Sequence, residues 1–323
     1  AASSCSWRSS SGAGAGQSAP AGASAELGGQ APGAALPIPG TPFVGRSQEL
    51  RALRALLHEE QARLVTIVGL GGSGKTRLAL EAANRERLAG REVAFVSLAA
   101  TSSAAAAASA VVEALGTPWH NDSAEDSLVK WLRHRELLLV LDNFESALDA
   151  APLVAKLLAT APGLTVIATS REPLKLQPER LLDIGGLEAP PLTPGGTLPH
   201  GRGPRGYDAV RLYVQQAARV TPGLKVRPEH METIGQICNL LEGLPLAIEL
   251  AASWSPLLST EEILAEVDRD PGALVSHHRD VPERHRSLWR VFDHTWERLT
   301  AEERSALVSL SVFPAGFGLA AAR

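Results

Sequence analysis

One short segment of the chain has the residue types and spacing of a phosphate-binding loop. Residues 69–76 read GLGGSGKT, which matches the pattern G-x-x-x-x-G-K-[ST]. In this pattern backbone N–H groups turn toward phosphate oxygens, the lysine reaches the terminal phosphates, and the hydroxyl binds Mg²⁺. We therefore expect Lys75 to bind phosphate and Thr76 to bind the metal. The other residues expected to bind nucleotide are Gly69, Gly71, Gly72, Ser73 and Gly74.

A second group of residues could bind the same metal. The apolar segment 137–141 ends in Asp142, and an acid at the end of a buried strand is the pattern that places a carboxylate beside Mg²⁺. A helix N-cap is the alternative role for this aspartate. Many hydrolases with such a loop carry a second acid at the next position. Here that position is Asn143, whose amide cannot act as a general base. Glu145 is a possible substitute for that base.

Another apolar segment, residues 164–168, is followed directly by the sequence Thr169-Ser170-Arg171. The carboxyl ends of parallel strands meet at one edge of a sheet, so we expect Arg171 to sense a terminal phosphate. The alternative is that Arg171 is a solvent-exposed residue at the rim of the sheet and contacts no phosphate. The predicted catalytic residues are Lys75, Asp142, Glu145 and Arg171, and the predicted Mg²⁺ ligands are Thr76 and Asp142.

Alternating apolar strands and helices must position these groups. Strands are predicted at 64–68, 93–96, 137–141, 164–168 and near 180–184, with helices at 48–57, 76–87, 102–115, 124–135 and 146–160. Ser47 is a candidate cap for the first helix. The alternation predicts an α/β fold, a doubly wound parallel sheet covered on both faces. A ligand-free glycine turn is a poor alternative for 69–76, because a strand precedes it and a helix follows.

The rest of the chain divides by composition. Residues 1–40 are rich in Ala, Gly, Ser and Pro and predict a disordered tether. The nucleotide-binding domain is predicted at 41–188 and a Gly/Pro-rich linker at 189–206. Apolar residues at helical spacing then predict helices at 208–220, 228–241, 244–255, 260–267, 286–298 and 301–311. The chain begins without Met and ends just after an apolar segment, so we expect a piece of a longer protein.

Composition excludes several classes of function. The 323 residues carry 31 basic and 35 acidic side chains, a net charge of −4, so we expect no direct nucleic-acid contact from this portion. The apolar stretches are shorter than the roughly 20 residues of a membrane-spanning helix, which predicts no membrane contact. Two distant cysteines predict neither a disulfide framework nor a zinc site, and favour the cytoplasm.

At this point the residues resemble the STAND class of P-loop ATPases, in the NB-ARC-related branch found in large bacterial regulators. The likeness rests on FVGR at 43–46, the phosphate loop, LDNFE at 141–145 and TSREPL at 169–174. GLPLAIELAA at 243–252 resembles the helical-domain motif of the family, and LSVF at 310–313 resembles the opening of its winged helix. The resemblance divides the remaining chain into a helical domain at 207–285 and the start of a truncated winged-helix domain at 286–323.

The resemblance implies further roles. Val44 and Arg46 would lie beside the adenine and ribose, and Pro245 would pack on the adenine, although a proline in the first turn of a helix needs no ligand to explain it. The implied function is an ATP/ADP-binding signalling switch with weak, Mg²⁺-dependent ATPase activity. Its implied partners are effector and sensor domains outside this sequence, and further copies of the chain in a homo-oligomer formed on activation. The alternatives are a turnover enzyme, such as a motor ATPase or a kinase, and a passive ADP-binding scaffold.

Overall fold

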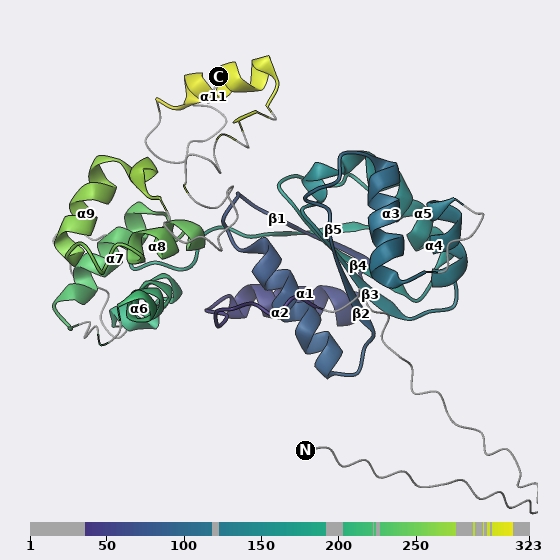
Figure 1. Ribbon diagram of the computed structural model, residues 1–323, viewed down its shortest axis with the longest axis horizontal. Helices are drawn as coiled ribbons and strands as arrows, with labels where there is room; N and C mark the ends of the chain where they lie inside the picture. Colours follow the sequence, from purple (N-terminus) through teal and green to yellow (C-terminus); the bar gives the residue numbers. More distant parts are fainter. Residues whose placement is uncertain are drawn as a thin grey trace, which may run out of the picture. The chain divides into compact units, whose positions relative to one another are not determined.

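The computed structural model describes residues 36–117, 123–191, 203–221, 223, 227–275, 287, 293, 296–297 and 299–312. Its first part is a five-stranded sheet with the order β2-β3-β4-β1-β5 (Figure 1). The strands are β1 (Leu64–Val68), β2 (Val93–Ser97), β3 (Leu137–Asp142), β4 (Leu164–Ser170) and β5 (Glu179–Asp183). All neighbouring strands are parallel, which confirms the predicted fold class.

The strand order decides which strand ends meet. β4 lies between β1 and β3, so the segment after β4 emerges between the phosphate loop and Asp142. Every residue of β3 and β4 is buried, as expected for central parallel strands covered on both faces. The register pairs Ile67 of β1 with Thr169 of β4. The phosphate loop, Asp142 and the segment 169–171 therefore lie at the carboxyl ends of three adjacent strands.

Helices cover both faces of the sheet (Figure 1). One face packs against α1 (Ser47–His58) and α2 (Lys75–Leu88), and the other against α3 (Ala104–Leu115), α4 (Ala124–Leu132) and α5 (Ala151–Thr160). Side chains of β3 alternate between the two cores: Leu138 and Val140 join the α1–α2 side, whereas Leu139 and Leu141 join the other. This alternation is the period-two geometry of a strand.

Two local predictions were wrong. Ser47 does not cap α1, because the helix starts at Ser47 itself and Arg46 occupies the N-cap position with a left-handed backbone, φ 60°. The predicted helix 146–160 begins later, at Ala151, after the short 3₁₀ turns η1 (Phe144–Ser146) and η2 (Leu148–Ala150). Pro152 explains the later start, because proline has no N–H to donate and is tolerated only in the first turn of a helix.

A second part of the chain is helical. It contains η3 (Pro204–Gly206), α6 (Asp208–Val220), α7 (His230–Leu240), α8 (Pro245–Ala252), α9 (Thr260–Arg269) and η4 (Pro271–Ala273). Buried residues from Leu187 to Leu274 form one shared hydrophobic core. Ser259 and Glu262 close a capping box that starts α9. The helices predicted at 208–220, 228–241, 244–255 and 260–267 thus exist with small shifts of their ends, while the predicted domain limits stay predictions.

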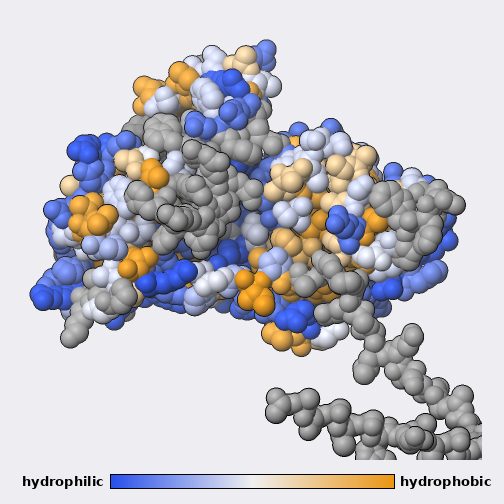
Figure 2. All heavy atoms as spheres, in the orientation of Figure 1, coloured by the Kyte–Doolittle hydropathy of each residue, from blue (hydrophilic) through white to orange (hydrophobic). Residues whose placement is uncertain are grey.

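The last described helix is α11 (Ala301–Leu310), started by a capping box between Thr300 and Glu303. None of its residues is buried, and Leu307 and Val308 are exposed, as is Val312 just after the helix. Figure 2 shows hydrophobic residues on the surface of this segment. The predicted helix 286–298 lies mostly outside the described residues, and the winged helix stays a prediction. Within the described part of the chain, no helix is long and apolar enough to cross a membrane.

Candidate nucleotide-binding site

The loop between β1 and α2 has the backbone of a phosphate cradle. Gly72 and Gly74 have φ values of 80° and 91°, a left-handed region that glycine adopts without steric cost. A Cβ atom on Gly72 would lie 2.9 Å from Cβ of Leu246, and one on Gly69 would lie 2.4 Å from the Ile184 carbonyl oxygen. The loop shape and its packing therefore both require glycine. Lys75 begins α2, so the first N–H groups of that helix are available to an anion at the loop.

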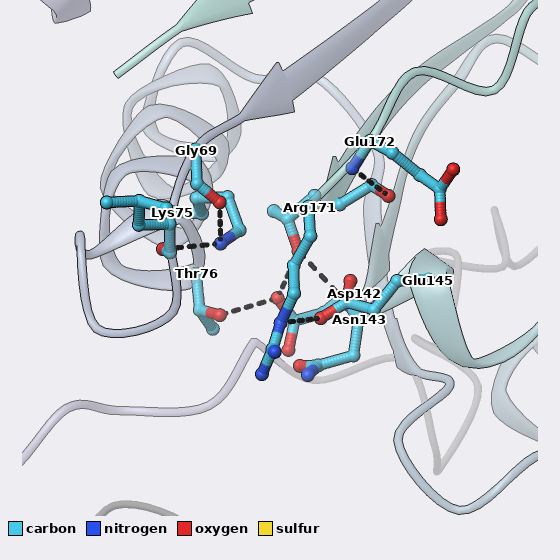
Figure 3. Close-up of polar contacts among 11 residues, drawn as sticks. Gly69, Lys75, Thr76, Asp142, Asn143, Glu145, Arg171 and Glu172 are labelled. Carbon is cyan, nitrogen blue, oxygen red and sulfur yellow. Dashed lines mark hydrogen bonds and ion pairs between the residues drawn. The ribbon is translucent and has the colours of Figure 1, made fainter. Parts of the chain in front are cut away.

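Lys75 lies inside the loop. Its Nζ donates hydrogen bonds to the carbonyl oxygens of Gly69 and Leu70, at 2.8 and 2.9 Å (Figure 3). Burial lowers the pKa of the ammonium group, opposed chiefly by the nearby charge of Glu145. The side chain is a buried cation whose present partners are neutral carbonyl oxygens. A phosphate oxygen would be a stronger partner, since hydrogen bonds between ionised groups are roughly twice as strong as neutral ones.

The Asp142 carboxylate accepts hydrogen bonds from two hydroxyl groups on different elements. Its Oδ1 accepts hydrogen bonds from Thr76 Oγ1 and Thr169 Oγ1, each at 2.6 Å. Burial raises the pKa of this carboxyl group, and the two hydroxyl donors act in the opposite direction. The carboxylate and the Thr76 hydroxyl are oxygen donors of the kind that Mg²⁺ prefers. Their chemistry and their contact fit the predicted metal site.

The residues after Asp142 make a tight turn. Asn143 has a left-handed backbone, φ 61° and ψ 43°, which asparagine tolerates better than most residues. This turn leads into η1, where Glu145 is buried with a relative exposure of 3%. The left-handed backbone therefore accounts for an asparagine at position 143, independently of the inability of its amide to act as a general base.

Glu145 and Arg171 form an ion pair. Arg171 Nε lies 3.3 Å from Glu145 Oε1, and the arginine side chain is 17% exposed (Figure 3). The Arg171 charge also acts on Lys75, lowering the pKa of its ammonium group. The structure thus brings both predicted residues to the edge that carries Lys75 and Asp142. It also joins them to each other, which the sequence did not predict.

Arg46 supports the loop through main-chain contacts. It is 5% exposed, and its Nη2 donates to the carbonyl oxygens of Ser73, at 2.9 Å, and Gly185. Its Nη1 pairs with Glu49 at 2.6 Å. Val44, in the same segment, is half-buried. The guanidinium of Arg46 therefore joins the phosphate loop to the segment after β5.

Comparison with known proteins identifies the family. Residues 46–173 match the model of the NB-ARC domain. An uncharacterized protein of Mycobacterium tuberculosis (strain H37Rv) is 34% identical over 289 residues, which are 86% of this chain and 67% of that protein. The chain belongs to the NB-ARC-like P-loop ATPases. The NB-ARC match includes Arg46, the phosphate loop, Asp142 and Arg171, but ends before Pro245.

Other relatives are longer. "Putative HTH-type transcriptional regulator Rv0890c" of Mycobacterium tuberculosis is 36% identical over 273 residues, which are 84% of this chain but 29% of that protein. Among solved structures, Cdc6p from Pyrobaculum aerophilum has a TM-score of 0.45 at 16% identity, covering 66% of this chain and 64% of that one. AMPPCP-bound DnaA from Aquifex aeolicus has a TM-score of 0.42 at 20% identity, covering 71% and 68%.

Beyond the NB-ARC match, the start of α8 contacts the phosphate loop. The Leu246 N–H donates to the Gly72 carbonyl oxygen at 3.3 Å, and Pro245 Cγ lies 3.9 Å from an ideal Cβ on Gly74. A mostly apolar pocket lies beside the loop. Its lining includes Leu70, Ser73, Gly185, Gly186, Leu241 and Leu244. Pro245 is therefore close to the loop of the NB-ARC domain, while its packing on an adenine stays a prediction.

Sequence reasoning missed Thr169 and Gly185. Thr169 was noted only as part of the segment leading to Arg171, yet its hydroxyl contacts Asp142. Gly185 directly follows the strand predicted near 180–184, and its carbonyl oxygen accepts a hydrogen bond from Arg46. The one signal available for Thr169 was a hydroxyl residue near the carboxyl end of a fully buried central strand.

Proposed function

We propose that this NB-ARC chain is the ATP- and ADP-binding switch module of a larger transcriptional regulator, and that it hydrolyses ATP slowly with Mg²⁺. The observation that supports this best is the ion pair between Arg171 and Glu145, at the edge that carries Lys75 and Asp142. A γ-phosphate would compete with Glu145 for the guanidinium of Arg171. ADP has no group to do so, and a switch needs such a difference between its two ligands.

The other roles follow from the positions of the side chains. Lys75 would bind the β and γ phosphates, with the loop N–H groups. Thr76 and Asp142 would hold Mg²⁺, which when bound would neutralise charge on the phosphate oxygens. Arg46 would fix the loop against the segment after β5 and, with Val44, line the adenine and ribose.

The expected nucleotide pocket extends to the helical part. Pro245 would contact the adenine from the start of α8, next to the apolar pocket beside the loop. A base that touches both parts of the chain would make their arrangement depend on the nucleotide. That dependence is the physical basis of a population shift between two conformations.

Slow hydrolysis is expected from the residues after Asp142. Asn143 cannot accept a proton from water, and its backbone is committed to a left-handed turn. Glu145 could accept one, but its carboxylate is already paired with Arg171. We therefore expect turnover well below the roughly 10 s⁻¹ typical of enzymes. A slow reaction suits a switch, because bound ATP must persist while the protein rearranges.

The regulator role is proposed from the relatives. The chain spans 29% of the transcriptional regulator described above, so effector and sensor domains would lie outside this sequence. Exchange of ADP for ATP would change the oligomeric state of the protein. Its proposed location is the cytoplasm. A motor ATPase or kinase, and a passive scaffold with permanently bound ADP, are the competing functions.

One set of measurements distinguishes the switch, the turnover enzyme and the passive scaffold. Steady-state phosphate release is measured for residues 1–323 with Mg²⁺ and ATP, with Lys75→Ala as the blank. The nucleotide bound to the purified protein is identified, and its oligomeric state is measured by light scattering with ADP and with ATP. Slow release with an ATP-dependent change supports the switch. Release of tens of phosphates per second without a partner would favour an enzyme, and ADP that does not exchange would favour a scaffold.

A further inference from the structure

Thr169 is a buried polar residue with two contacts at the candidate metal site. It is the sixth residue of β4, and its relative exposure is 1%. Its Oγ1 donates to Asp142 Oδ1 at 2.6 Å and accepts the Asn143 N–H at 3.0 Å. One hydroxyl thus contacts both the side chain of the proposed Mg²⁺ ligand and the backbone that follows it.

The two hydroxyl donors to Asp142 differ in what else they can do. Thr76 lies at the start of α2 and is itself a proposed Mg²⁺ ligand. Thr169 lies on a central strand and is no part of the phosphate loop. It is therefore the donor that can hold the Asp142 carboxylate without being a ligand.

The contact with Asn143 adds a second constraint. A left-handed backbone is unfavourable for an ordinary residue, and asparagine lowers that cost without removing it. The Asn143 N–H would need a partner in this partly buried turn, and Thr169 Oγ1 accepts it. The same hydroxyl therefore stabilises the turn that leads to Glu145.

We propose that Thr169 is a positioning residue for the magnesium site, orienting the Asp142 carboxylate toward the metal and Thr76. The inference rests on the proposed function, because it presumes that nucleotide and Mg²⁺ bind here. Groups that orient a metal ligand typically change metal affinity by about 10- to 100-fold when they are removed. We expect an effect of that size for the Mg²⁺-dependent part of nucleotide binding.

A matched control is available on the neighbouring strand. Thr66 of β1 is fully buried and pairs in register with Ala168, the residue before Thr169. Its Oγ1 has no hydrogen-bond partner among the described residues. Thr66→Val and Thr169→Val thus make the same chemical change at adjacent buried positions, but only the second removes a contact with Asp142.

The experiment measures ADP affinity by calorimetry for the full chain, with Mg²⁺ and with EDTA. Wild type and Thr66→Val should bind ADP more tightly with Mg²⁺ than with EDTA. Thr169→Val should keep the EDTA affinity and lose about 10- to 100-fold of the increase that Mg²⁺ gives. Thr169→Ser, which keeps the hydroxyl, should restore it. Thr169→Ala makes the same test if the valine variant does not fold.

Each other outcome has a defined meaning. An undiminished Mg²⁺ increase in the valine or alanine variant would overturn the role of Thr169. Equal losses with Mg²⁺ and with EDTA would also overturn it, because they would show a general structural effect. If wild type itself gained nothing from Mg²⁺, the proposed metal site would fail first, and the proposal for Thr169 with it.

Discussion

The ion pair between Glu145 and Arg171 allows a sharp test of nucleotide sensing. Glu145→Gln keeps the shape and an acceptor oxygen but removes the negative charge beside the guanidinium. ATP brings a γ-phosphate that can replace this charge, whereas ADP does not. We therefore expect the substitution to increase the affinity for ATP relative to ADP, and to lower phosphate release further if Glu145 is the general base.

The size of the effect can be estimated from the geometry. The two charged groups approach to 3.3 Å. Two unit charges about 4 Å apart interact with about 4 kcal/mol at an effective dielectric constant of about 20. Because the Arg171 side chain is 17% exposed, water screens part of this energy. We expect about 1–2 kcal/mol to remain as a preference for ATP, a factor of about 5–30 in relative affinity.

The assay is competition calorimetry with ATP and ADP on wild type, Glu145→Gln, Arg171→Ala and the double variant. Arg171→Ala should spare ADP binding and weaken the preference for ATP, and adding Glu145→Gln should then change nothing further. The control is Glu125→Gln, which removes a surface pair with Lys156 whose side chains are 43% and 45% exposed. Such exposed pairs contribute only about 0–1 kcal/mol.

An unchanged ratio of ATP to ADP affinity in Glu145→Gln would refute the competition between Glu145 and the γ-phosphate. Equal losses of both nucleotides in Arg171→Ala would make Arg171 a general binding residue. A gain from Glu145→Gln that persists without Arg171 would show that the carboxylate repels phosphate directly.

Two further predictions concern binding and stability. Lys75→Ala should lower ATP affinity by a factor of about ten or more, about 1.4 kcal/mol, because it removes the loop cation, and calorimetry should show no such loss for Arg85→Ala, whose side chain is 59% exposed on the same helix. Burial raises the pKa of Glu249, opposed by Arg77 and Arg219. The native state therefore binds this proton more tightly than the unfolded state, and stability falls as pH rises through the folded-state pKa. In urea unfolding, Glu249→Gln should stabilise the chain more near pH 7 than near pH 4, and a pH-independent difference would contradict this sign.

Sequence patterns alone determined the fold class and the phosphate loop. The glycine spacing at 69–76 is local, since the conformations and the lysine it specifies belong to consecutive residues. The long apolar runs before Asp142 and Arg171 predicted central parallel strands, because only strands buried on both faces lack alternation. These features predicted the residues Lys75, Thr76 and Asp142 before any contact was known.

Local start signals were less reliable. Ser47 is a good capping residue, yet the chain uses a left-handed Arg46 because its guanidinium is held by carbonyl oxygens of two other segments. Residues 146–150 carry apolar spacing that fits a helix, but the turn at Asn143 and Pro152 delay it until Ala151. In both places a distant contact or a neighbouring turn outweighed the local preference.

Only the tertiary structure decided how the polar groups pair. β4 pairs with β3, the strand before it in the chain, and with β1, the first strand, and that pairing places Thr169 between the phosphate loop and Asp142. The contact between Glu145 and Arg171 spans 26 residues and depends on the same strand order. Residue types and spacing along a chain cannot specify such contacts, because the strand order is set by the packing of the whole sheet and its helices.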